Sequence, residues 1–74
     1  MVTLIGMGSG KWEALSEQAQ QAVRSAGLVF GAKRLLAGLP ADCTARQFAL
    51  YQPADILETL AQNPGQDAVV LYSG

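Results

Sequence analysis

Short apolar runs alternate along this chain with stretches in which apolar residues recur at helical spacing. Three runs, Val2–Gly6, Leu28–Phe30 and Ala68–Tyr72, are almost continuously apolar and contain β-branched or aromatic residues. Such runs predict strands that are covered on both faces, as in a parallel sheet. A further strand near 44–50 gives a weaker signal, because polar residues interrupt its apolar positions.

The first helical stretch lies between the first two predicted strands. Ser16 belongs to the residue types that cap helix N-termini, and it precedes a helix predicted over Glu17–Ser25. Gly27 is predicted to end this helix as its C′ residue. The buried face of the helix is predicted at positions i, i+3, i+4 and i+7, namely Ala19, Ala22, Val23 and Ala26.

Two further helices are predicted. The second is a short helix over 32–37, stopped by Gly38 and Pro40. The third begins near Pro53, because proline is favoured in the first helical turn. Its apolar face is predicted at four positions of helical spacing, namely Ile56, Leu57, Leu60 and Ala61.

The alternation of strands and helices predicts the fold class. It indicates an α/β fold with an open, mainly parallel sheet, flanking helices and right-handed crossovers. The length of 74 residues allows one small domain. The last strand is followed at once by Ser73-Gly74, with no crossover helix after it. We therefore expect residues 1–74 to be the incomplete N-terminal part of a longer protein.

The composition narrows the classes of function. Half of the residues are hydrophobic and only 15% are charged, which predicts a partner, here a homo-oligomer, over part of the surface. The net charge of −1 gives no field that favours nucleic acid or an anionic membrane. With no histidine and the single Cys43, the chain offers no cysteine cluster for a metal and no internal disulfide. A cytoplasmic protein without a membrane span or metal site is expected.

Three glycines at every second position, Gly6, Gly8 and Gly10, follow the first strand. They remove Cβ atoms at the carboxyl end of a strand, where open α/β sheets bind ligands. They favour a loop that faces a ligand, and a tight turn without ligand contact stays an alternative. Two nucleotide-binding loops are disfavoured by spacing: Lys11 stands at the third glycine of G-x-G-x-x-G, and Trp12 replaces the Ser or Thr of a P-loop.

These residues together resemble the tetrapyrrole (corrin and porphyrin) methylase superfamily. The G-x-G-P-G loop of that family is matched by Gly6-Met7-Gly8-Ser9-Gly10, with Ser9 in place of proline. Its leucine-threonine pair is matched by Leu15-Ser16, and Ser73-Gly74 matches the first half of its small-Gly-Asp-Pro motif. The run Gly31-Ala32-Lys33-Arg34-Leu35-Leu36 is similar to the precorrin-6Y C5,15-methyltransferase branch, in its C5-methylating part (cobalt-precorrin-7 C5-methyltransferase).

The resemblance implies a two-domain enzyme that methylates C5 of a precorrin in cobalamin biosynthesis, of which this chain is an N-terminal portion without activity of its own. S-adenosylmethionine is the implied cofactor, with Ser9, Ser73 and Gly74 as its contacts. Gly6, Gly8 and Gly10 are implied to shape a trough for the tetrapyrrole substrate. A C15-methylating, decarboxylating domain is implied as a fused or separate partner, and no catalytic base is assigned.

Lys33 and Arg34 follow the second strand at the same edge of the sheet, where an arginine fork can bind a substrate carboxylate. A solvated helix charge is the alternative for each, and it has more weight for Lys33. Trp12 is interpreted as a hydrophobic anchor of the long loop, with a ring-stacking platform as the alternative. Tyr72 is interpreted as a core residue with a wet hydroxyl, with a hydroxyl placed at the site as the alternative. Two alternative functions stay open: a methylase for another tetrapyrrole, and a non-catalytic Rossmann-like binding or assembly module.

Overall fold

The computed structural model describes residues 1–8 and 11–73 of the chain. They form eight elements in the order predicted, with one short 3-10 helix that the sequence pattern did not predict. The elements are β1 (Val2–Gly6), η1 (Trp12–Ala14), α1 (Glu17–Ser25), β2 (Leu28–Phe30), α2 (Lys33–Leu36), β3 (Arg46–Phe48), α3 (Pro53–Gln62) and β4 (Ala68–Tyr72).

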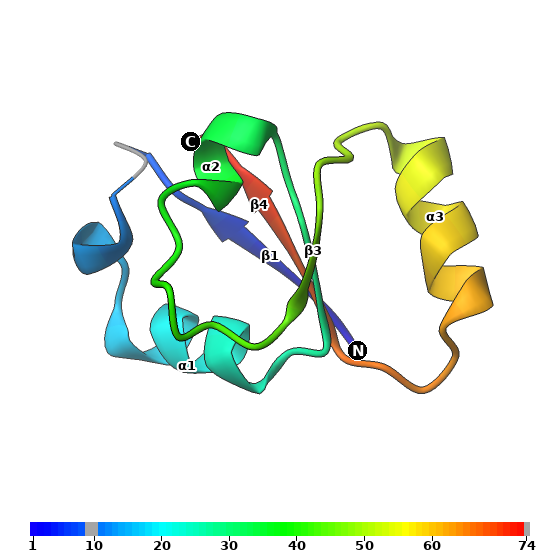
Figure 1. Cartoon of the computed structure of the whole chain (residues 1–74), viewed down its shortest axis with the longest axis horizontal. Coiled ribbons are helices and arrows are strands. Elements are labelled where there is room, and N and C mark those ends of the chain that lie inside the picture. Colours follow the sequence, from blue (N-terminus) through cyan, green and yellow to red (C-terminus); the bar gives the residue numbers. More distant parts are fainter. Residues whose placement is uncertain (9–10, 74) are drawn as a thin grey trace.

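The four strands form one parallel sheet in the order β1-β4-β2-β3. Among the described residues, β1 and β3 are therefore its edges, and β4 and β2 lie in its centre. Figure 1 shows α1 and α2 on one side of the sheet and α3 on the other. The predicted α/β class with an open parallel sheet is confirmed.

The side of the sheet that carries α1 and α2 is closed, and we call it the closed face. Its core includes Ile5 of β1, Val29 of β2 and Val69 of β4, which are at most 6% exposed. Val23 of α1 and Leu35 of α2 pack onto them. Ser16 Oγ accepts a hydrogen bond from the Ala19 amide at 3.1 Å, so the predicted cap of α1 is confirmed.

The opposite side carries α3 alone, and its core is smaller. Ile56 of α3 packs on a cluster with Leu28 and Phe30 of β2 and Ala68 of β4. The Phe30 ring stacks on Phe48 with ring centroids 5.3 Å apart. This cluster lies under the centre of the sheet and leaves β1 outside it.

Two expectations about burial are wrong for this side of the molecule. Val2 and Leu4 are 49% and 68% exposed, because β1 is an edge strand that α3 does not reach. Leu57 is 66% exposed and Ala61 is exposed, so only Ile56 and Leu60 of the predicted α3 face meet the sheet.

Gly27 follows α1 as predicted, but its φ angle does not lie in the left-handed region, where the described glycines are Gly8 and Gly65. A Cβ on Gly27 would instead collide with the end of the Gln66 side chain and stand 3.7 Å from the Asp67 carbonyl oxygen. The Gly27 amide also donates to that oxygen at 2.8 Å. The Gln66 amide is the end of a flexible side chain and 3.7 Å is an ordinary van der Waals distance, so these contacts do not require glycine at this position.

Candidate functional site

A cavity of about 250 Å³ opens at the carboxyl edge of the sheet. The end of β4, from Val70 to Ser73, forms one wall, and Ala32 and Leu35 from the start of α2 form another. Arg34 and Tyr51, the latter from the segment between β3 and α3, complete the lining. Ligands of open α/β sheets bind at this edge, so this cavity is the candidate site.

The cavity combines an apolar floor with polar groups at its rim. Leu35 and Leu71 are buried, whereas Tyr51 is 68% and Tyr72 49% exposed. Arg34 is exposed, and the ion pairs found among residues 1–8 and 11–73 do not include it. An exposed guanidinium can bind a carboxylate with two parallel hydrogen bonds. The arrangement suits one end of an apolar ligand that carries an anionic group.

The structure brings together two of the residues predicted for the site, Arg34 and Ser73. Lys33 is exposed and does not line the cavity. The predicted contacts Ser9, Gly10 and Gly74 lie outside the described residues.

Gly6 and Gly8 differ in their surroundings, and neither lines the cavity. A Cβ on Gly6 would stand 3.1 Å from the Tyr72 ring, so this ring occupies the space that the missing side chain leaves. Gly6 is nevertheless exposed, so the Tyr72 ring covers it only in part. Gly8 has a φ of 47° and no atom within 4 Å of its Cβ position, so its backbone is accessible. The Met7 amide donates to the Tyr72 carbonyl oxygen at 2.7 Å and ties the start of this loop to β4.

Tyr51 is the polar lining residue that sequence reasoning missed, together with the apolar lining residues Ala32, Leu35, Val70 and Leu71. Tyr51 follows β3 by three positions, and in a parallel sheet the segments after all strands converge on one edge. An aromatic residue directly after the third predicted strand was therefore the signal that could have identified it. Trp12, interpreted as an anchor, is half-buried and packs against the core of the closed face.

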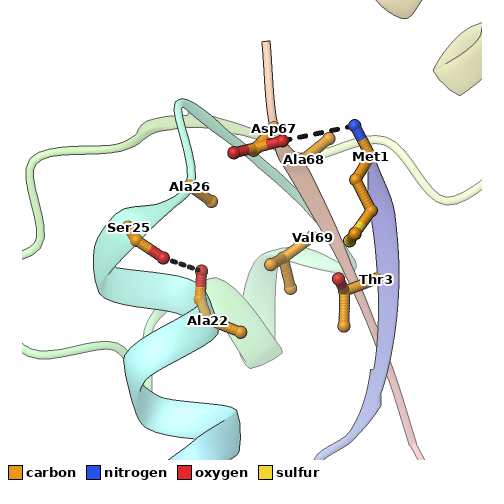
Figure 2. Close-up of a pocket in the computed structure, with 8 residues that line it drawn as sticks. All are labelled: Met1, Thr3, Ala22, Ser25, Ala26, Asp67, Ala68 and Val69. Atoms are coloured by element: carbon orange, nitrogen blue, oxygen red, sulfur yellow. Dashed lines mark hydrogen bonds and ion pairs between the residues drawn. The ribbon is translucent and has the colours of Figure 1, made fainter.

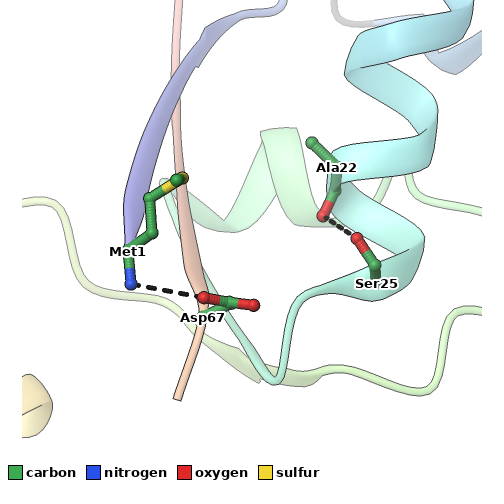
Figure 3. Close-up of polar contacts among 4 residues, drawn as sticks. All are labelled: Met1, Ala22, Ser25 and Asp67. Atoms are coloured by element: carbon green, nitrogen blue, oxygen red, sulfur yellow. Dashed lines mark hydrogen bonds and ion pairs between the residues drawn. The ribbon is translucent and has the colours of Figure 1, made fainter. Parts of the chain in front are cut away.

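A second, smaller pocket of about 140 Å³ lies at the amino edge of the sheet (Figure 2). The N-terminal ammonium group of Met1 pairs there with Asp67 at 3.2 Å, and both groups are largely exposed. Ser25 Oγ donates to the carbonyl oxygens of its own helix, at 2.9 Å from Gln21 and 3.4 Å from Ala22 (Figure 3 draws the latter). These polar groups already have partners within the chain, and this edge is not the one at which α/β sheets bind ligands.

Neither a metal cluster nor a membrane span is found within residues 1–8 and 11–73. No group of three His, Cys, Asp or Glu side chains comes together there. None of the helices in this part of the chain is long and apolar enough to cross a bilayer.

No protein-family model and no curated protein matches the sequence. Among solved structures, the chain is similar to the X-ray structure of a cobalamin biosynthetic enzyme, the cobalt precorrin-4 methyltransferase CbiF. The TM-score is 0.69 at 18% sequence identity, and the match covers 99% of this chain. The chain spans about a third (34%) of the length of that enzyme. At this identity the likeness establishes the fold, which is a four-stranded parallel sheet flanked by helices.

Proposed function

We propose that the chain is the N-terminal part of an S-adenosylmethionine-dependent methyltransferase that acts on C5 of a precorrin in cobalamin biosynthesis. The observation that carries this proposal is the cavity at the carboxyl edge, in a fold shared with a precorrin methyltransferase. Arg34 and Ser73, both candidate site residues from the sequence, lie together in that cavity.

The size of the cavity fits one part of such a site. Sites that enclose a drug-sized ligand measure roughly 300–1,000 Å³. At about 250 Å³, this cavity holds one end of a ligand and leaves the remainder uncovered. A second part of the protein is therefore expected to complete the site, which agrees with a chain that spans a third of the methyltransferase it resembles.

A bound sulfonium donor supplies a methyl group that is already activated for transfer. The task of the protein is then to hold donor and acceptor in line, because alignment alone removes much of the barrier. In this chain, Arg34 would fix a carboxylate of the macrocycle at the rim of the cavity. Ser73 would contact the donor with its hydroxyl group, and the Tyr51 and Tyr72 rings would exclude water from the apolar floor.

Isothermal titration calorimetry tests the proposal. S-adenosylmethionine is titrated into the 74-residue chain and into the longer protein of which it is a part. We expect binding to the longer protein and weak or no binding to the chain. Tight binding by the 74-residue chain would contradict the division of the site, and an inert longer protein would exclude the methyltransferase.

Arg34→Ala tests the division of labour within the site, with Lys33→Ala as the matched control one residue away. Arg34→Ala is expected to weaken binding of the macrocycle by about tenfold or more while donor binding persists, because it removes a charge-assisted pair of hydrogen bonds. Lys33 lies outside the cavity, so Lys33→Ala is expected to have little effect on the binding of either the donor or the macrocycle. Equal loss of donor and macrocycle in Arg34→Ala would exclude the role given to this arginine.

A non-catalytic α/β module is the second candidate, and the contact between Gly6 and the Tyr72 ring favours it. It gives one glycine of the loop a packing role without any ligand. If the chain belongs to such a module, S-adenosylmethionine is expected to leave the melting temperature of the longer protein unchanged. If the longer protein does respond, absorbance assays with purified corrin and porphyrin intermediates separate a C5 precorrin enzyme from a methylase for another tetrapyrrole.

A further inference from the structure

The side of the sheet that carries α3 has an uncovered apolar strip along β1. Parallel pairing places Phe30, Val70 and Leu4 in one row across β2, β4 and β1 on this side. Their exposure rises along the row, from 0% at Phe30 through a half-buried Val70 to 68% at Leu4. The neighbouring row ends in Val2, which is 49% exposed. We call the surface formed by Val2 and Leu4 the open strip.

The width of the open strip corresponds to one helix. Neighbouring strands lie about 4.8 Å apart and a helix with its side chains is roughly 10 Å across, so one helix covers about two strands. Two helices, α1 and α2, pack on β1, β4 and β2 of the closed face, whereas α3 alone lies on the opposite side of the sheet (Figure 1). One further helix beside α3 would cover β1 and the adjacent half of β4.

The handedness of the connections indicates where such a helix comes from. The chain passes from β3 to β4 in the direction of β1, with α3 on this side of the sheet. Crossovers between parallel strands are right-handed in nearly all cases. A continuation from β4 past β1 to a new strand runs in the same direction, so its helix must lie on the α3 side. The outer edge of β1, which pairs with β4 alone among the described strands, would receive that strand.

We infer that the open strip is the docking surface of an amphipathic crossover helix that follows β4 in a longer polypeptide. Its apolar side chains would pack on Val2 and Leu4 of β1, beside α3. This inference rests on one part of the proposed function, namely that the chain continues, and it does not depend on S-adenosylmethionine.

A grafted helix tests the inference on the 74-residue chain itself. A designed amphipathic helix of about four turns is joined after residue 74 through a short Gly/Ser linker. The control carries the same residues in an order that spreads the apolar ones around the helix. The patterned helix is expected to raise the melting temperature by about 5 °C or more, since about 1 kcal/mol shifts a domain of this size by roughly 4–8 °C. It is also expected to lower the binding of a hydrophobic dye, and the control helix is expected to do neither.

Substitutions in the extended chain locate the contact. Leu4→Glu is expected to remove the gain in melting temperature, whereas Gln21→Glu, at an exposed position of α1, is expected to keep it. Equal melting temperatures for the patterned and control helices would overturn the inference. So would a 74-residue chain that is a dimer by ultracentrifugation and becomes monomeric with Leu4→Glu, because a second copy would then cover the strip. A gain from the helix without any binding of S-adenosylmethionine by the longer protein would reject the methyltransferase and retain the docking surface.

Discussion

Ile5 and Leu4 are neighbours on β1, but they belong to opposite sides of the sheet and differ tenfold in exposure. Ile5 points to the closed face and is 6% exposed, whereas Leu4 points to the open strip and is 68% exposed. Both residues are large and aliphatic, so the difference does not arise from their chemistry. It arises from what covers each side: α1 and α2 on one, and α3 at a distance on the other.

The central strands show the other outcome of the same pattern. All three residues of β2 are buried, and Ala68, Val69 and Leu71 of β4 are at most 3% exposed. These strands have a neighbour on each side and helices near both faces. A continuous apolar run therefore indicates a strand that is suited to burial on both faces. Whether the described residues bury the strand depends on its position in the sheet.

The largest expected difference between the two sides comes from truncating the two neighbours on β1. Ile5→Ala is expected to lower the free energy of unfolding by about 2–5 kcal/mol, because it removes buried methylene groups and leaves a cavity. Leu4→Ala is expected to change it by about 0.5 kcal/mol or less, since Leu4 is mostly exposed. Urea unfolding followed by circular dichroism measures both.

Comparing Leu4→Ala with Ile5→Ala also shows whether the open strip is covered in solution. A loss above about 2 kcal/mol for Leu4→Ala, accompanied by a dependence of stability on protein concentration, would mean that a second copy buries Leu4. The difference between the two sides would then exist only in the isolated chain.

The fold could be predicted largely from local signals. The bounds of β1, β4 and α1 follow from uninterrupted apolar runs and from the capping residue Ser16, which act over a few residues. The order of the strands could not be predicted this way, because nothing in the run Val2–Gly6 distinguishes an edge strand from a central one. Strand order depends on contacts between segments far apart in the sequence, and so does the exposure of Leu4 and Leu57.

The candidate site was predictable to a smaller extent. Ser73 was indicated by the family resemblance and Arg34 by its position after the second strand, and they share the cavity because the ends of parallel strands meet at one edge. Tyr51 was missed because its contribution depends on how the segment after β3 returns toward β4. The Tyr72 ring over Gly6 could not be foreseen either, because it depends on the register that pairs these two residues.

A smaller difference in the free energy of unfolding is expected when the N-cap residues of α1 and α3 are substituted. The N-cap Ser16 of α1 accepts the Ala19 amide, whereas Gln52, the N-cap of α3, makes no capping hydrogen bond with its side chain. Ser16→Ala is expected to cost about 1 kcal/mol, and Ser16→Asp to restore most of it. Gln52→Asp is expected to add up to about 1 kcal/mol, because it supplies the cap that α3 lacks. If Gln52→Asp leaves the urea midpoint unchanged, α3 does not limit the stability of its side of the sheet.

The smallest expected effects belong to two arginines, one on each side, that stack on aromatic rings. Arg24 of α1 lies 5.4 Å from the centroid of Trp12 and pairs with Asp42 at 3.0 Å. Arg46 of β3 lies 5.3 Å from the centroid of Phe48 and donates to the neutral Asn63 amide oxygen at 3.2 Å. Each substitution by alanine is expected to cost about 1 kcal/mol or less, since both side chains are partly or largely exposed.

Salt separates these two contacts. The cost of Arg24→Ala is expected to shrink between low salt and 0.5 M sodium chloride, because salt screens the exposed ion pair with Asp42. The cost of Arg46→Ala is expected to change less, since its hydrogen-bond partner carries no charge. Thermal melts of the two variants and the parent chain at both salt concentrations measure this difference. Equal salt sensitivity would mean that the Asp42 pair contributes nothing measurable, and that the Trp12 stack alone holds Arg24 against the closed face.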